Sequence, residues 1–239
     1  NDHYSVWANT VHIEDFDTVK AHIDQAIDTK SDFHTQFRVQ VSKNKYRYIR
    51  ADGRLENNKM FGINMDITEQ VEAEQRINEL ANHDTLTGLA NRHALKTYVE
   101  KEFARSDRAN NRCLCLYLDL NKFKPINDTH GHNIGDAVLV DIAKRLQSLC
   151  RVSDIAARVG GDEFVIIVSD IEKDFDIDNM IERAHNEIIK PVVTSKGKMF
   201  VDASIGCSVY PDEADSLDEL IRIADERMFD KKEFVRETR

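Results

Sequence analysis

The feature that most limits the fold of this chain is an apolar run, CLCLYLDL, at residues 113–120. It is apolar at odd and even positions alike, which is typical of a strand buried on both faces, because a half-exposed strand alternates with polar residues. The run ends close to a carboxylate, Asp119. A carboxylate that leaves a buried strand can bind a ligand, or it can merely start the next turn. The run therefore predicts a central strand with a candidate functional acid at its end.

From residue 83 onward, helical and strand patterns alternate. After a leading helix the predicted order is β-α-β-β-α-β, the ferredoxin-like arrangement of an α+β domain, which by itself specifies no chemistry. The expected elements are a leading helix at 94–103, the strand at 113–120, a polar loop at 121–133, a helix at 138–146, a hairpin at 155–168, a helix ending before Pro191, a strand at 200–210 and a last helix at 217–228.

The first eighty residues follow other patterns. A helical pattern at 14–29 precedes three stretches of period-two alternation, which predict a small antiparallel sheet. The stretch at 68–82 is rich in Glu, Gln and Ala, with Ala73, Ile77 and Leu80 at heptad-like spacing. Two interpretations stay open for it: a solvated connecting helix, or a short two-stranded coiled coil that transmits a signal. Three apolar positions do not decide, because a coiled coil needs about three or four heptads.

Charge and composition restrict the partners. The chain has 33 Lys and Arg against 43 Asp and Glu, a net charge of −10. This argues against binding nucleic-acid polymers, because phosphate backbones are held by basic stripes. No apolar run reaches eighteen residues, so we expect no transmembrane segment. Four cysteines without paired spacing favour a reducing compartment, and we expect a cytoplasmic location, with a membrane anchor upstream of Asn1 left open.

Acids on two of the expected elements predict a metal site. Asp162 and Glu163 follow a pair of glycines at 160–161, which allow positive φ and a close approach of the backbone to a ligand. Two adjacent acids between apolar strands are costly unless a cation neutralises them. If the hairpin lies beside the central strand, these acids converge with Asp119. Oxygen ligands without clustered His or Cys favour Mg²⁺ or Mn²⁺.

The segment at 121–136 supplies groups that suit a phosphorylated ligand, since divalent ions held by few carboxylates generally also bind substrate phosphates. Lys122 and Lys124 can meet phosphate charge. Asp136 has two interpretations: an acid favoured at a helix start by the macrodipole, or an acceptor for the N1–H and N2–H₂ donors of guanine. Asn127 offers a further contact.

Five segments of the chain resemble the GGDEF family of diguanylate cyclases, in the same order and at the same spacing. They cover nearly all of 83–239. The two signature segments are DLNKFKPINDTHGHNIGD (119–136) and RVGGDEF (158–164), and the others are HDTLTGLANR (83–92), SIG (204–206) and ADERMFDKK (224–232).

The resemblance implies a reaction. Two GTP molecules, one on each of two facing domains, condense to cyclic di-GMP with release of two pyrophosphates. Each 3′-hydroxyl attacks the α-phosphate of the opposite nucleotide, and metal ions lower the pKa of the hydroxyl and stabilise the departing pyrophosphate. One domain holds half of the reactants, so the resemblance implies a two-fold homodimer.

The resemblance also assigns site residues. Asp119, the backbone carbonyl of Leu120 and Asp162 are the implied ligands of Mg²⁺ or Mn²⁺, and Glu163 is a further metal-binding or catalytic carboxylate beside the catalytic Asp162. The implied substrate-binding residues are Asn127 and Asp136 for guanine, Lys124 and Lys232 for phosphate, and His132, Gly160 and Gly161.

Arg151 and Asp154 form an RxxD pattern shortly before Gly160, where the family has its product-inhibition site for cyclic di-GMP. Two other RxxD patterns, at 222–225 and 227–230, show that only the position supports this interpretation. Arg suits bidentate phosphate binding and stacking on guanine. The alternative is a surface ion pair, worth roughly 0–1 kcal/mol.

The N-terminal part resembles the C-terminal half of a PAS sensor domain. The matching segments are VWANTVHIEDFDTV (6–19), the three strands and MDITE (65–69). The two resemblances imply a partial PAS/PAC sensor domain at 1–67, a helical signalling linker at 68–82 and a GGDEF diguanylate cyclase domain at 83–239.

Three functions are therefore compared. The first is an active, product-inhibited enzyme under control of a sensor. The second is a non-catalytic receptor that binds cyclic di-GMP through Arg151 and Asp154, and the third is a dimerising signalling adaptor. The intact glycines and acids at 160–163 favour the enzyme.

Overall fold

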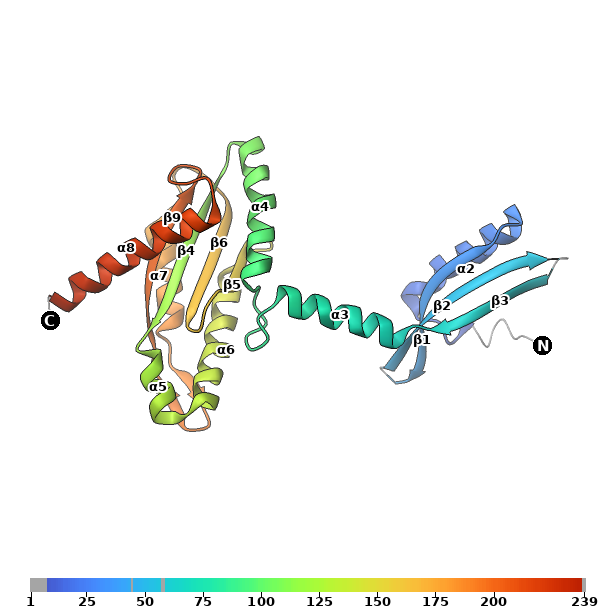
Figure 1. Cartoon of the computed structure of the whole chain (residues 1–239), viewed down its shortest axis with the longest axis horizontal. Coiled ribbons are helices and arrows are strands. Elements are labelled where there is room, and N and C mark those ends of the chain that lie inside the picture. Colours follow the sequence, from blue (N-terminus) through green and yellow to red (C-terminus); the bar gives the residue numbers. More distant parts are fainter. Residues whose placement is uncertain (1–7, 44, 57–58, 238–239) are drawn as a thin grey trace. The chain divides into compact units, whose positions relative to one another are not determined.

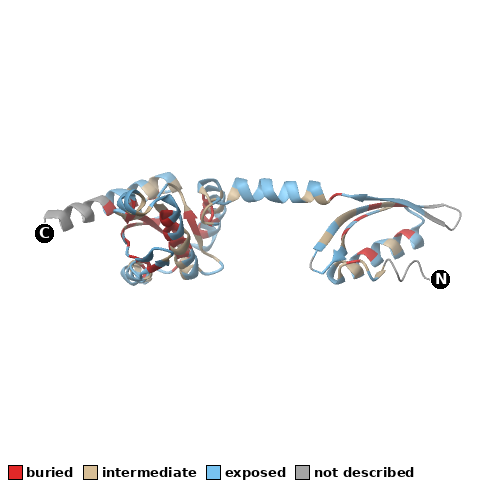
Figure 2. Cartoon of the chain, turned by 90° about the horizontal axis from the view of Figure 1, so that it is seen from below, coloured by how far each residue is buried: buried red, intermediate tan, exposed pale blue. Residues whose placement is uncertain are grey.

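The computed structural model describes residues 8–43, 45–56 and 59–237, with the side chains at 55–60 and 229–237 outside that description. The chain forms two compact units, Asn1–Asn78 and Glu79–Arg239, each described by itself (Figure 1). Helix α3 (Thr68–Asn82) crosses the division and buries none of its residues, so it is drawn mostly in the exposed colour in Figure 2. The predicted helix at 68–82 is confirmed, whereas its role and the predicted domain bounds stay predictions.

In the first unit, one helix packs on a three-stranded antiparallel sheet, as the sequence predicts. Helix α2 (Ile13–Thr29) precedes β1 (Phe33–Ser42), β2 (Lys45–Glu56) and β3 (Lys59–Asp66), in the sheet order β1-β2-β3. Val19 of α2 is buried with Phe37 and Ala51 of the sheet and with Val11. The alternation in these strands arises because α2 covers only one sheet face.

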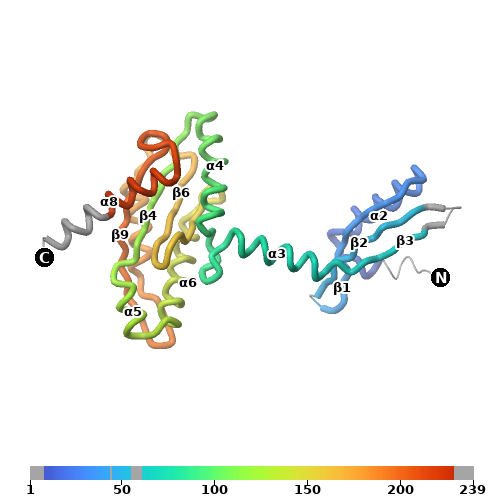
Figure 3. The backbone as a smooth tube through the Cα atoms, viewed as in Figure 1, coloured from blue at the N-terminus to red at the C-terminus, as the bar shows by residue number. Residues whose placement is uncertain are grey.

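The second unit has a four-stranded sheet in the order β5-β6-β4-β9, with all neighbours antiparallel. Its helices cover both faces of the sheet: α6 and α7 share one core cluster with it, and α4 and α8 share the other (Figure 3). This is the predicted ferredoxin-like order. The bounds are α4 (Arg92–Ala109), β4 (Arg112–Asn121), α6 (His132–Leu149), β5 (Ile155–Arg158), β6 (Glu163–Ile171), α7 (Ile177–Ile188), β9 (Asp202–Tyr210) and α8 (Leu217–Glu237).

The central position of β4 explains its unbroken apolar sequence. Leu114, Leu116 and Leu118 are fully buried on the side of α6 and α7. Cys115 and Tyr117 are buried on the side of α4 and α8. Because both sets are covered, neither face of the strand carries polar residues until Asp119. The prediction of a strand buried on both faces is confirmed.

Two short elements differ from the sequence-based expectation. The predicted loop at 121–133 is wrong, because a helix, α5 (Phe123–His130), occupies most of it. Phe123 and Ile126 lie about one helical turn apart and pack on the core. Two apolar positions are too few to reveal a helical period in the sequence. A hairpin of β7 (Val192–Thr194) and β8 (Gly197–Met199) was not expected, since strands of three residues show no clear alternation.

None of the described helices combines the length and apolar character needed to cross a lipid bilayer.

Candidate active site

The register of the sheet brings the predicted acids onto neighbouring strands. In the antiparallel pair of β4 and β6, Asp119 lies opposite Glu163. The backbone N–H of Leu120 donates to the carbonyl of Asp162, with an N···O distance of 3.2 Å. Residues opposite each other in an antiparallel pair project to the same face, so Asp119 and Glu163 share one side of the sheet. The hairpin thus lies beside the central strand, which is the condition under which the acids were expected to converge.

The glycine pair in the hairpin turn shows a close approach at one position only. A Cβ atom on Gly160 would lie 2.0 Å from Oε2 of Glu163, whereas one on Gly161 would meet nothing within 4 Å. Neither glycine uses the left-handed φ region that glycine allows. Gly160 is therefore required by contact: the Glu163 carboxylate folds back over its Cα.

Tyr117 is a site neighbour that sequence reasoning missed. The carboxylate of Glu163 lies near its hydroxyl and is one of the groups that raise its pKa. Burial raises the pKa of Tyr117, and the nearby carboxylates of Glu163, Asp225 and Asp119 raise it further, so the hydroxyl keeps its proton and acts as a donor. The signal was present in the sequence: Tyr117 lies two residues before Asp119 and so on the same strand face.

Arg158 connects the glycine turn at 160–161 to Asp84. Its Nε and Nη2 donate to the carbonyl of Gly161 at 3.1 and 2.7 Å, and its Nη1 donates to both carboxylate oxygens of Asp84 at 3.0 and 3.2 Å. Burial opposes ionisation of Asp84, but hydrogen bonds from Thr87 and Arg158 outweigh it and lower the pKa of Asp84. This ion pair was not predicted, although both residues lie in the segments 83–92 and 158–164.

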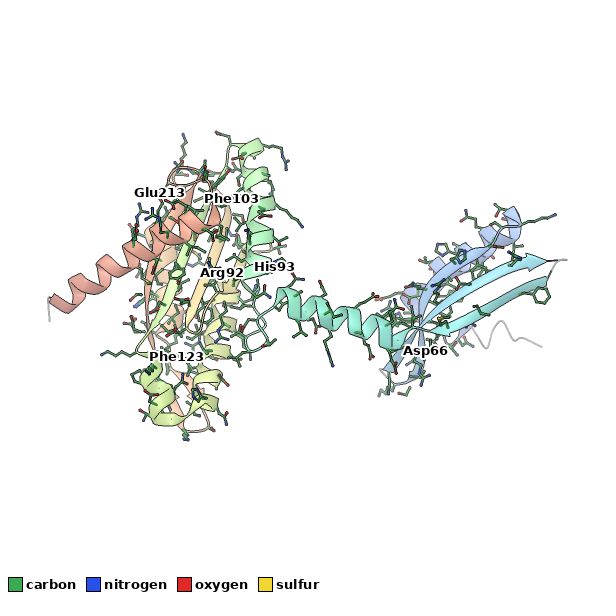
Figure 4. All side chains as sticks on the ribbon, in the orientation of Figure 1. Asp66, Arg92, His93, Phe103, Phe123 and Glu213 are labelled. Carbon is green, nitrogen blue, oxygen red and sulfur yellow. The ribbon has the colours of Figure 1, made fainter. Side chains whose placement is uncertain are left out.

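The α5–α6 corner assembles several predicted substrate residues. Phe123, the first residue of α5 and labelled in Figure 4, is buried. Gly135 packs against Asn127, because a Cβ there would lie 1.8 Å from Asn127 Oδ1. Asp136 follows Gly135 and is exposed. Asn127 therefore contacts the start of α6, next to Asp136, and the assignment of these two residues to guanine stays a prediction.

The remaining predicted substrate residues are less defined. Lys124 and His132 are exposed on α5 and α6. Lys232 lies in α8, within the stretch whose side chains are outside the described part. Their assignment to phosphate or nucleotide stays a prediction.

Arg151 and Asp154 lie at the opposite end of β5 from the glycine turn, because β5 runs only from Ile155 to Arg158. Asp154 Oδ2 accepts from the backbone N–H of Arg151 at 2.7 Å, and Asp154 Oδ1 accepts from the N–H of Ser169 at 3.1 Å. The Arg151 side chain is exposed. The structure therefore keeps this pair apart from the acids of the hairpin.

Within the described part of the chain, no three His, Cys, Asp or Glu side chains form a group arranged to hold a metal ion. The predicted donors are the carboxylates of Asp119 and Asp162 and the carbonyl of Leu120, with Glu163 as a further metal-binding or catalytic carboxylate. This donor chemistry fits Mg²⁺, which proteins usually hold with one or two carboxylates while water and substrate phosphates complete the shell. The metal site stays a prediction.

The sheet order, the helices on both faces and the acids on adjoining strands define an α+β domain of ferredoxin-like topology. A family model described as "Diguanylate cyclase, GGDEF domain" matches residues 81–238. The chain therefore belongs to the GGDEF family.

Known relatives place it among proteins named for cyclic di-GMP metabolism. It is 34% identical over 166 residues to the bifunctional diguanylate cyclase/cyclic di-GMP phosphodiesterase MucR of Pseudomonas aeruginosa, covering 70% of this chain and 24% of MucR. It is 33% identical over 168 residues to the cyclic di-GMP phosphodiesterase PdeR of Escherichia coli, covering 70% of this chain and 25% of PdeR. The chain thus spans about a quarter of these two relatives.

A solved structure confirms the fold assignment. A sensory box/GGDEF family protein from Caulobacter crescentus superimposes with a TM-score of 0.61 and 34% identity, covering 64% of this chain and 99% of that one. The relatives' names include both synthesis and breakdown of cyclic di-GMP. Family membership therefore identifies a cyclic di-GMP signalling domain and leaves the activity of this chain to be proposed.

Proposed function

We propose that the second unit is a diguanylate cyclase, which condenses two GTP into cyclic di-GMP and releases two pyrophosphates. The observation that carries this proposal is the register that sets Asp119 opposite Glu163, beside a turn in which both glycines and both acids are intact. A chain that had lost the activity would be free to lose these costly acids between apolar strands.

In this proposal Asp119, the Leu120 carbonyl and Asp162 hold Mg²⁺ or Mn²⁺. The bound ion supplies a Lewis acid that neutralises phosphate charge and lowers the pKa of the attacking 3′-hydroxyl. Asn127 and Asp136 bind the guanine edge. Asp136 is exposed at the α5–α6 corner, so a nucleotide can reach it from the solvent.

The remaining residues position and neutralise the reactants. Lys124 and Lys232 pair with phosphate oxygens, His132 contacts the nucleotide, and Gly160 and Gly161 let the turn approach it. The 3′ oxygen forms a bond to the α-phosphorus while the bond to pyrophosphate breaks. The carboxylates of Asp162 and Glu163 are the proposed acceptors of the hydroxyl proton, and the nearby Tyr117 hydroxyl is the proposed donor that positions Glu163.

The reaction requires a two-fold homodimer, because each domain presents one GTP and the attacking hydroxyl belongs to the other. Holding both nucleotides face to face replaces an encounter in solution with an oriented reaction.

Regulation is assigned to two parts of the chain. Cyclic di-GMP binds at Arg151 and Asp154 and inhibits the enzyme. The first unit is part of a PAS-type sensor, supported by its helix followed by a three-stranded antiparallel sheet, and α3 is the linker that transmits its signal. We place the protein in the cytoplasm, where its four cysteines stay reduced.

A catalytically inactive receptor, or a dimerising adaptor, is the second candidate. The separation of Arg151 and Asp154 from the hairpin acids favours the receptor, because binding at that turn needs none of the catalytic residues.

The test is product formation from GTP and Mg²⁺ as a function of protein concentration. We expect cyclic di-GMP to form with a specific activity that rises with protein concentration, and chelation of the metal to stop the reaction. Asp162→Ala should abolish turnover, whereas Asp174→Ala, which removes an exposed acid elsewhere, should not. Absence of product at high concentration of folded protein would reject the enzyme.

A further inference from the structure

We propose that Tyr98 is a positioning residue for the turn at 151–154, tying this turn to helix α4 and thereby setting its affinity for cyclic di-GMP. The proposal rests on the proposed function, which assigns cyclic di-GMP to Arg151 and Asp154. Tyr98 itself contacts neither of these side chains through a hydrogen bond; it acts through Ser153 and Ser169.

The first link is direct. Tyr98 projects from α4, and its hydroxyl donates to the backbone carbonyl of Ser153, in the middle of the turn. A tyrosine hydroxyl has one proton, so this bond uses its only donor. Burial raises the pKa of Tyr98, and the proton therefore stays on the hydroxyl at neutral pH.

The second link passes through β6. Tyr98 Oη lies 2.8 Å from Oγ of Ser169, and because the tyrosine proton is already used, Ser169 donates this bond. Ser169 is 2% exposed. Its backbone N–H donates to Asp154 Oδ1 at 3.1 Å. A side chain of α4 is thereby connected to the acid of the RxxD pattern.

The third link closes the turn on itself. Asp154 Oδ2 accepts from the N–H of Arg151 at 2.7 Å, and the N–H of Asp154 donates to the carbonyl of Arg151 at 3.0 Å. The backbone pairing of β5 with β6 begins only at Ile155. Just before it, the Asp154 carboxylate, rather than a backbone carbonyl, accepts the hydrogen bond from the N–H of Ser169 on β6. The place of Arg151 is therefore set by Asp154, and that of Asp154 by Ser169.

The hydrogen bonds of the Tyr98 hydroxyl to Ser153 and Ser169 hold the middle of this turn in place. Without the Tyr98 hydroxyl, the Ser153 carbonyl and the buried Ser169 hydroxyl both lose a partner. Losing one such bond changes an equilibrium by about fivefold. We therefore expect Tyr98→Phe to weaken cyclic di-GMP binding by about fivefold through a less ordered turn.

The matched control is Tyr210→Phe. The Tyr210 hydroxyl donates to Asp107 Oδ1 of the same helix at 2.5 Å, and its ring stacks on Phe103. Both variants thus remove one partly buried hydroxyl that ties α4 to the rest of the unit. A purely structural role for Tyr98 predicts the same behaviour in both.

The experiment compares the whole chain in three forms, wild type, Tyr98→Phe and Tyr210→Phe, by two measurements. The first is hydrogen exchange at the amides of Asp154 and Ser169, with the central β6 amide of Val165 as internal reference. The second is the Kd for cyclic di-GMP by calorimetry. We expect Tyr98→Phe alone to speed exchange at these two amides by about fivefold or more and to raise Kd by about fivefold.

Equal exchange at these amides in the two variants overturns the proposal, and so does an unchanged Kd in Tyr98→Phe when the wild type binds. If the wild type binds no cyclic di-GMP, the proposed inhibitory function of the turn fails, and the exchange measurement alone decides whether Tyr98 positions it.

Discussion

At Gly160, a hydrogen atom in place of a side chain leaves room for a carboxylate. Adding a methyl group would bring Cβ to 2.0 Å from Glu163 Oε2, and the flexible Glu163 side chain would give way rather than the backbone. The expected cost is therefore local to the site and small for the fold.

We predict that Gly160→Ala lowers cyclic di-GMP synthesis by at least about tenfold, a loss of roughly 1.4 kcal/mol of transition-state stabilisation, because the added Cβ displaces the Glu163 carboxylate. Thermal unfolding should change little, and Gly161→Ala, which meets nothing within 4 Å, is the control for folding. An unchanged rate in Gly160→Ala would show that the position of Glu163 is not required.

Tyr117 gives a pH prediction. Its pKa is raised above the ordinary value of 10 by burial and by the carboxylates around it. Between pH 10 and that raised value the folded state binds more protons than the unfolded state, so stability falls as pH rises. We predict a flatter decline above pH 10 in Tyr117→Phe, measured as unfolding free energy in urea. A decline identical to that of the wild type contradicts the assignment.

At the scale of elements, Arg158 joins the glycine turn to the segment that precedes α4. Its side chain is 13% exposed and that of Asp84 is 22% exposed. Arg158 also donates its backbone N–H to the carbonyl of Ala90, so main chain and side chain tie the same two segments. Removing the guanidinium leaves a partly buried carboxylate without its cation.

We predict that Arg158→Ala lowers the free energy of unfolding by about 2–3 kcal/mol, and that Arg158→Lys recovers only part of it, since an ammonium cannot reach Asp84 and Gly161 as a fork. A double-mutant cycle with Asp84→Asn measures the coupling, which should exceed about 1 kcal/mol. Strictly additive effects would mean that the pair contributes nothing as a pair.

Some of these elements were predictable from sequence and others were not. The strand at 113–120 was predictable because a strand buried on both faces is apolar at successive positions. The ferredoxin-like order followed from the order of the helical and strand patterns along the chain. The helix α5 was missed because one apolar face of two residues, Phe123 and Ile126, has no visible period.

The residue types of the site were predictable from sequence, but the contacts that depend on the strand register were not. Adjacent acids and glycines in sequence identify a turn, but the contact of Glu163 with Tyr117 and the fork of Arg158 depend on which residues face each other across strands. The φ of Gly160 and Gly161 also depends on the turn actually formed, and it is ordinary in both. The roles of the predicted ligand residues stay predictions.

At the scale of the whole molecule, the exposed apolar side chains of α3 bear on how two copies of the chain pair. Ile77 and Leu80 are 67% and 58% exposed in the single chain. A strip of apolar side chains on a helix without buried residues suits a second copy of the same helix.

We predict that Ile77→Glu together with Leu80→Glu raises, by at least about threefold, the protein concentration at which specific activity is half-maximal, because paired α3 helices would then repel each other. The control Gln75→Glu with Asn78→Glu adds the same charge to exposed positions of α3. Matching behaviour of the two double variants would favour the solvated connecting helix.

The four-residue length of β5 also limits how inhibition can work. Four extended residues span about 13 Å, so the two turns that this strand connects are joined by a stiff backbone yet are too far apart for one small ligand to cover both. Cyclic di-GMP bound at the proposed site of Arg151 and Asp154 therefore leaves the proposed GTP-binding residues uncovered. Raising GTP should not restore the rate: the maximal velocity falls while KM stays nearly constant, and initial-rate kinetics at fixed product concentrations measure this directly.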